Sequence, residues 1–164
     1  GSEDAGTDQI AMGAEYTMPL AGGSLMIRYN KATDDGTTTT EKEAQNYGAK
    51  LTMGAISAIA SRGESTVGSG AAQTDDITAD GLAISYNLGG GMKISASTMK
   101  AEDDKEVSGT QAEEYSANVA EVAYTVAPGL TAKVTYLDFD YKEGSTGAGN
   151  DSGSMTQFTL SASF

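Results

Sequence analysis

The feature that most constrains the fold of this chain is a period-two alternation of apolar and polar residues. It is clearest at residues 81–88, where Leu82, Ile84 and Tyr86 alternate with small or polar side chains. A period of two places successive side chains on opposite faces of a β-strand. The alternation occurs in nine segments, which are residues 9–20, 25–30, 46–53, 56–60, 81–88, 92–97, 120–126, 130–136 and 158–164. We therefore expect an all-β chain of nine strands, with residues 1–164 forming one domain.

The connections between these segments alternate in length. Short, Gly-bearing connections at residues 21–23, around Gly54, and at 89–91 and 127–129 are suited to tight hairpins. Long polar stretches lie between them, at about 32–44, 62–79, 101–114 and 142–153. Short turns at one end and long loops at the other are typical of an antiparallel transmembrane β-barrel, whose turns are periplasmic and whose loops are extracellular.

The apolar sides of the nine segments carry no charged residue, although charged residues make up 20% of the chain. A Lys or Arg that faces lipid at the middle of a bilayer costs about 2–4 kcal/mol, whereas a lumen is wet. We therefore expect the opposite sides to line a pore, with a predominantly basic wall in which Arg28, Lys50 and Lys133 lie four or five residues from a short turn. Solvated wall residues without a role in selectivity are the alternative. The expected pore-lining residues are Glu15, Arg28, Lys50, Lys93, Glu121 and Lys133.

Six tyrosines fall on the apolar sides of the segments. Aromatic belts at the lipid–water interface explain this placement, and ordinary packing within a sheet is the alternative. The tyrosines are Tyr16, Tyr29, Tyr47, Tyr86, Tyr124 and Tyr136.

Composition excludes several classes of function. The chain has no Cys, which excludes disulfides and thiolate chemistry, and no His, which removes the commonest general base and metal ligand. A net charge of -13 argues against nucleic acid as a partner. Without a base beside a Ser or Asp nucleophile, we expect no enzyme activity.

The expected loops are acidic, and oxygen-rich clusters can bind Ca²⁺ or Mg²⁺. No set has the spacing of an EF-hand, so solvated loops without a cofactor are the favoured interpretation. The acidic residues are Asp34, Asp35, Glu41, Glu43, Asp75, Asp76, Glu102, Asp103, Asp104, Glu113 and Glu114.

Nine is an odd number of strands, and closing such a meander on itself would require a parallel seam. Residues 1–8 resemble an extracellular loop remnant. At roughly 18 residues for a strand and its connection, a 16-stranded barrel needs about 290 residues. We therefore expect the C-terminal portion of a longer barrel, with the remaining strands supplied by the same parent chain or by a partner chain. An eight-stranded barrel, with one segment not a strand, is the alternative.

The last segment resembles the terminal strand of outer-membrane proteins, in which a terminal aromatic follows apolar residues at every second position. Phe158, Leu160, Ala162 and Phe164 match this pattern, which implies recognition by the barrel-assembly machinery. Residues 80–91 and 120–130 are similar to recurrent hairpins of α-proteobacterial general diffusion porins.

The resemblance to these porins covers most of residues 9–164. It implies a 16-stranded homotrimer in the bacterial outer membrane, in contact with lipid and lipopolysaccharide, through which small hydrophilic solutes and ions diffuse passively. The family's constriction loop would lie upstream of this chain. The other interpretation of the sequence is a soluble or fibrous surface β-protein, such as an adhesin that binds through its acidic loops.

Overall fold

The computed structural model describes residues 9–34, 41–68, 75–104, 112–143 and 149–163. Within these ranges the chain is entirely β-structure and turns, with no helix. The strands are β1 (Gln9–Leu20), β2 (Gly23–Asp34), β3 (Lys42–Met53), β4 (Ile56–Val67), β5 (Asp75–Gly89), β6 (Met92–Asp103), β7 (Glu113–Ala127), β8 (Leu130–Lys142) and β9 (Asp151–Ala162).

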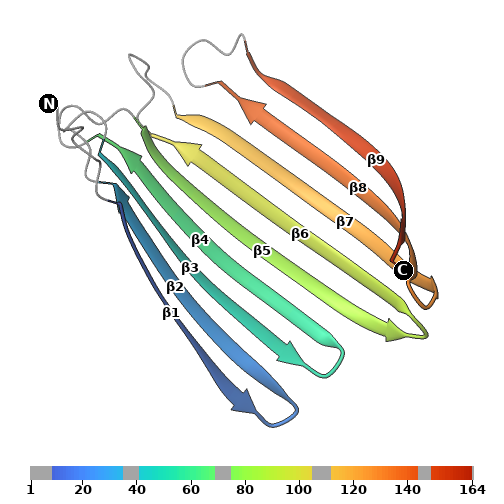
Figure 1. Cartoon of the computed structure of the whole chain (residues 1–164). Helices are drawn as coiled ribbons and strands as arrows, with labels where there is room; N and C mark the ends of the chain where they lie inside the picture. Colours follow the sequence, from blue (N-terminus) through green and yellow to red (C-terminus); the bar gives the residue numbers. More distant parts are fainter. Residues whose placement is uncertain (1–8, 35–40, 69–74, 105–111, 144–148, 164) are drawn as a thin grey trace, which may run out of the picture.

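Each strand pairs with the next one in an antiparallel ladder, which gives one open sheet in the order β1 to β9 (Figure 1). β1 and β9 are the two edges of this sheet and are not paired with each other. The expectation of an all-β chain with nine antiparallel strands is confirmed, and the eight-strand alternative is wrong for this chain.

The four short connections form tight turns at one end of the sheet, here called the turn end (Figure 1). Gly22 joins β1 to β2 with φ +86°, and Gly129 joins β7 to β8 with φ +78°. Two-residue hairpin turns need such positive φ values, which glycine adopts without a steric penalty. The predicted hairpin positions are therefore confirmed. The opposite end of the sheet is called the loop end.

The strands extend further toward the loop end than the alternation predicted. β4 continues to Val67 and β5 begins at Asp75, so strand replaces most of the loop expected over residues 62–79. Strand also replaces the ends of the loops expected at 32–44, 101–114 and 142–153, because the strands continue beyond their regular apolar alternation. The predictions for residues 1–8, Asp35 and Phe164 lie outside the described residues.

The sheet is a single layer without an apolar interior. Ala117, which is 7% exposed, is the buried hydrophobic residue of the described ranges, and none of their large side chains is fully buried. The accessible surface is 10896 Å², against roughly 7,600 Å² for a compact monomer of this mass. Both faces of the sheet are therefore open.

Candidate functional site

One face of the sheet carries most of the exposed apolar side chains, and we call it the apolar face. Ile84, Leu160 and Phe158 lie on it and are 54%, 69% and 79% exposed. Among the 27 large hydrophobic residues that are exposed, Ile59, Ile77, Met99 and Met155 lie on the opposite face. The other 23 lie on the apolar face. They form a contiguous apolar surface, unlike the single, scattered apolar residues found on the surfaces of most soluble proteins.

On the apolar face of β2 to β9, apolar side chains occupy only the part nearest the turn end, and polar side chains follow them toward the loop end. In β1 they continue along the whole strand, from Ile10 to Leu20. We call the apolar area that these residues form together, across all nine strands, the apolar band. Its segments in the other strands are Leu25–Tyr29, Tyr47–Met53, Ile56–Ala60, Leu82–Leu88, Met92–Ala96, Ala120–Val126, Leu130–Tyr136 and Phe158–Ala162.

The border of the apolar band runs obliquely across the strands. Between β3 and β4, the last band residue Tyr47 lies opposite Arg62, which is already polar. The same two-residue step recurs between β5 and β6, and again at Tyr136 opposite Thr156 between β8 and β9. Between the other neighbours from β2 to β9 the border stays level, as at Tyr29 opposite Tyr47. The steps all go toward the turn end, so the border follows one slanted line.

The slope of this border follows from standard strand dimensions. From β2 to β9 the border moves by three two-residue steps, about 20 Å at ~3.3 Å per residue, across seven strand spacings of ~4.8 Å. The line is therefore inclined by roughly 30° to the perpendicular of the strands, and by about 40° when β1 is included. From β2 to β9 the band segments are five to seven residues long, which is about 13–20 Å perpendicular to the slanted line at ~3.3 Å per residue.

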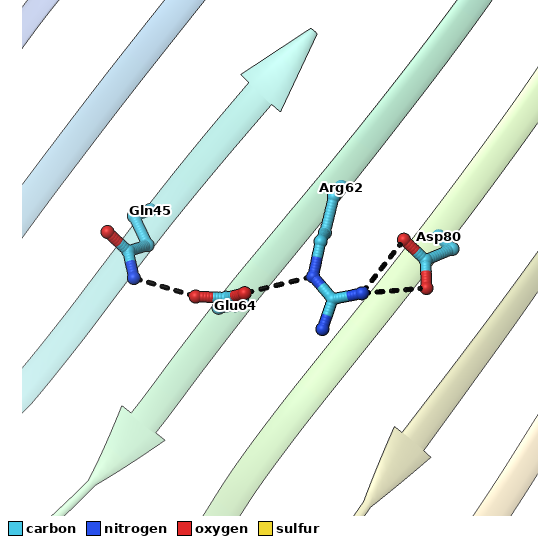
Figure 2. A network of polar contacts seen from close by, with 4 residues as sticks. All are labelled: Gln45, Arg62, Glu64 and Asp80. Carbon is cyan, nitrogen blue, oxygen red and sulfur yellow. Dashed lines mark hydrogen bonds and ion pairs between the residues drawn. The ribbon is translucent and has the colours of Figure 1, made fainter.

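Beyond the band, the apolar face carries a row of ion pairs, which we call the ion-pair belt. At its centre Glu64 accepts hydrogen bonds from Gln45 Nε2, at 2.7 Å, and from Arg62 Nε, at 2.9 Å (Figure 2). The guanidinium of Arg62 also lies 3.3 Å from Asp80 on the next strand (Figure 2). Because Arg62 and Asp80 are exposed and Glu64 is partly exposed, water screens the ion pairs and they stabilise the sheet only weakly. The other pairs of the belt are Lys31–Glu43, Lys100–Glu102 and Lys142–Glu114.

All six predicted belt tyrosines lie on the apolar face, within the apolar band. Tyr29, Tyr47 and Tyr136 are the last apolar residues before the polar border, and the rings of Tyr29 and Tyr47 are 5.3 Å apart between centroids. The other three lie nearer the turn end: Tyr16, Tyr86 and Tyr124.

The six predicted pore-lining residues all lie on the other face, which we call the polar face. Glu121 and Lys133 form an ion pair of 3.0 Å, and Thr135 Oγ1 donates a hydrogen bond to the same carboxylate. Glu15 lies directly opposite Arg28 in the register of β1 and β2. The remaining two, Lys50 and Lys93, also lie on this face.

A shallow hollow of about 240 Å³ lies on the polar face beside Lys93 and Glu121. Four serine side chains reach it, from β4, β5 and β6, so hydroxyl donors and acceptors surround it. One of them, Ser57, has an Oγ atom that is shielded from solvent and has no hydrogen-bond partner. The serines are Ser57, Ser85, Ser95 and Ser97. This hollow is large enough to hold water or a small hydroxylated solute against the polar face.

Sequence reasoning missed a reversal of the two faces in the loop half of β5 to β9. Leu137 and Phe139 lie on the polar face, next to Ala117 and Val119 of β7. The signal was present as adjacent apolar residues at Val119–Ala120 and Tyr136–Leu137, where the alternation changes phase.

Most of the acidic residues expected in loops lie in strands, so that expectation is corrected. They occur near the loop end, where the strands run past the apolar band; the strand members are Asp34, Glu43, Asp75, Asp76, Glu102, Asp103, Glu113 and Glu114. Glu41 and Asp104 lie just outside strands. In the part of the chain that the structure describes, no three His, Cys, Asp or Glu side chains are grouped to hold a metal ion. No helix there is long and apolar enough to cross a membrane.

Comparison with known proteins found no similarity. No protein-family model matches the chain. No curated protein and no solved structure matches it either.

Proposed function

We propose that this chain forms part of the wall of a transmembrane β-barrel pore in the bacterial outer membrane. The apolar band faces lipid, and the polar face lines a water-filled lumen. Small hydrophilic solutes and ions cross this lumen by passive diffusion, without catalysis. The observation that carries the proposal is the straight, slanted border of the apolar band across eight or more strands.

A slanted border is what a flat bilayer imposes on tilted strands. The strands of outer-membrane barrels tilt by ~35–45° and carry an apolar girdle about 25 Å tall. The border slope of roughly 30–40° is close to this tilt, and the band, about 13–20 Å wide from β2 to β9, covers part of the height of such a girdle. A soluble sheet has no reason to end its apolar residues along one straight line that crosses the strands obliquely.

The order of side chains along the apolar face supports the same placement. Three tyrosines, Tyr29, Tyr47 and Tyr136, stand at the border of the band. The ion-pair belt begins directly beyond Tyr29, at Lys31, and opposite Tyr47, at Arg62. Tyrosine favours the boundary between hydrocarbon and water, where its ring and hydroxyl are both satisfied. Lys31 and Arg62 have long apolar stems that reach across this boundary and keep their charges in water.

In a membrane, the two edge strands β1 and β9 need hydrogen-bond partners for their backbone groups. An unpaired strand edge in hydrocarbon leaves N–H and C=O groups without partners, at several kcal/mol for each group. β1 and β9 therefore pair with further strands in the assembled pore. A 16-stranded, trimeric general diffusion porin is the arrangement that the sequence resemblance favours, with the turn end in the periplasm.

Site-directed labelling tests the proposal, because the chain has no Cys of its own. Single substitutions Ile84→Cys and Ser85→Cys place one thiol on each face of β5, one residue apart. In native membranes we expect Ile84→Cys to react with an apolar, bilayer-restricted maleimide, and Ser85→Cys with a water-soluble one. Leu160→Cys and Thr159→Cys provide the same comparison in β9.

Reaction of both members of each pair with the water-soluble reagent would contradict the proposal. So would recovery of the chain as a monodisperse species without detergent, which is the behaviour expected of a soluble surface β-protein.

A further inference from the structure

The charges of the polar face are sorted by sign along the strands. Level with the middle of the apolar band, this face carries four cations and two carboxylates. These are Arg28, Lys50, Lys93 and Lys133, with Glu15 and Glu121. Near the loop end it carries five carboxylates and one cation, namely Asp34, Asp75, Asp103, Glu113 and Asp151, with Lys42. We call these the basic zone and the acidic zone.

The two zones are too far apart to neutralise each other in salt solution. Lys133 lies opposite Ala123 of β7, ten residues from Glu113, which is ~33 Å at ~3.3 Å per residue. Arg28 and Asp34 of β2 are six residues apart, which is ~20 Å. The Debye length is about 8 Å at physiological ionic strength. Each zone therefore selects ions by its own sign, and the space between them is bordered on β7 and β8 by the apolar side chains of Ala117, Val119, Leu137 and Phe139.

We propose that the pore conducts ions asymmetrically, with the acidic zone enriched in cations and the basic zone enriched in anions. This inference rests on the proposed function and adds a directional property to it. When the loop side is positive, cations enter through the zone that concentrates them, and anions enter from the turn side through theirs. Both ions then accumulate between the zones and the current is high. The opposite voltage drains both ions from this space and the current is low.

The test is single-channel recording from the assembled protein, purified from membranes and reconstituted in planar bilayers in 0.1 M KCl. A single Asn150→Cys thiol at the loop end, blocked from one chamber by a charged reagent, reports the orientation of each channel. We expect the current with the loop side positive to exceed the current at the opposite voltage by roughly twofold. In 1 M KCl, where the Debye length is about 3 Å, the two currents should become nearly equal.

Paired variants assign the effect to the acidic zone. Glu113→Gln with Asp151→Asn removes two carboxylates from the polar face, and we expect it to reduce the asymmetry. Asp138→Asn with Asp140→Asn removes two carboxylates from the apolar face in the same half of the sheet, and should leave the asymmetry unchanged.

Each outcome is decisive. Channels with equal currents at both voltages in 0.1 M KCl would overturn the inference and leave the pore intact. An equal effect of the two variant pairs would also overturn it, since the face of the charge would then be irrelevant. Absence of channels, together with water-accessible thiols on both faces, would overturn the proposed function and the inference with it.

Discussion

Tyr136 and Leu137 are consecutive residues of β8, yet their side chains lie on opposite faces of the sheet, Tyr136 in the apolar band and Leu137 on the polar face. The apolar side of the strand thus changes at this peptide bond. On the turn side of it the apolar face carries Val134, and on the loop side it carries Asp138. The change marks the height at which, in the proposed pore, the outer surface passes from hydrocarbon to water.

A charge placed in the apolar band should be far more costly than a charge one residue away. We expect Ile84→Lys to lower the free energy of unfolding from lipid bilayers by about 2–4 kcal/mol, because the ammonium would face hydrocarbon. Ser85→Lys points to the polar face and should change it by less than about 1 kcal/mol. Urea titration of vesicle-inserted protein measures both values. Similar losses for the two variants would show that the faces are not in different solvents.

The ion-pair belt should contribute a small stabilisation that depends on salt. Arg62→Gln removes the contacts to Glu64 and Asp80, but Arg62 and Asp80 are exposed and Glu64 is partly exposed. We expect a slightly lower unfolding midpoint at low ionic strength and no difference from the parent chain at 1 M NaCl, where the attraction is screened. Arg62→Lys is the control, because it retains the charge without the fork that reaches both carboxylates. A loss that persists at high salt would indicate a packing role.

The cations of the basic zone should lower the cation-to-anion permeability ratio of the pore. Lys50→Gln with Lys93→Gln removes two of its four cations. We expect the cation-to-anion permeability ratio to rise roughly twofold, measured as the reversal potential in a tenfold KCl gradient. Lys31→Gln with Lys142→Gln removes the same charge from the apolar face and is the matched control. If the control shifts the reversal potential as much, the polar face does not line the conduction path.

Two glycines of neighbouring strands should respond to alanine in opposite ways. A Cβ at Gly23 would collide with the backbone carbonyl of Thr52, so Gly23→Ala must push β2 away from β3. At Gly48 the nearest atom to a new Cβ is 3.9 Å away. Gly48→Ala should therefore stabilise the sheet by about 0.5–1 kcal/mol, since alanine loses less backbone entropy than glycine in a strand. Equal unfolding midpoints in urea for the two variants would contradict this difference in packing.

The strands and the hairpins could be predicted from the sequence, because both are local. Leu82, Ile84 and Tyr86 reveal their strand by spacing alone, and Gly22 and Gly129 reveal their turns by residue type. The pairing partners could not be predicted, because they depend on the register between strands. The sequence therefore assigns Arg62 to the loop expected at residues 62–79, because it does not show the partners of this residue. In the structure Arg62 lies in β4, opposite both Tyr47 and Asp80.

The faces of the candidate pore-lining residues could also be predicted, because parity within one strand determines the face. The oblique border could not, since it appears only when the last band residues of all strands are set side by side. The reversal at Leu137 was hidden for a simpler reason. Two adjacent apolar residues break the alternation, and the strand seems to end there although it continues to Lys142.

The direction of the two edge strands limits what can complete the structure. Eight successive antiparallel pairs make β1 and β9 run the same way. Two identical copies inserted with the same polarity would thus bring β9 of one beside β1 of the other as parallel neighbours. A ring built only of antiparallel pairs instead needs an odd number of strands between these edges, the first and last of which run opposite to β9 and β1. A second copy inserted with the same polarity has the right parity but the wrong direction.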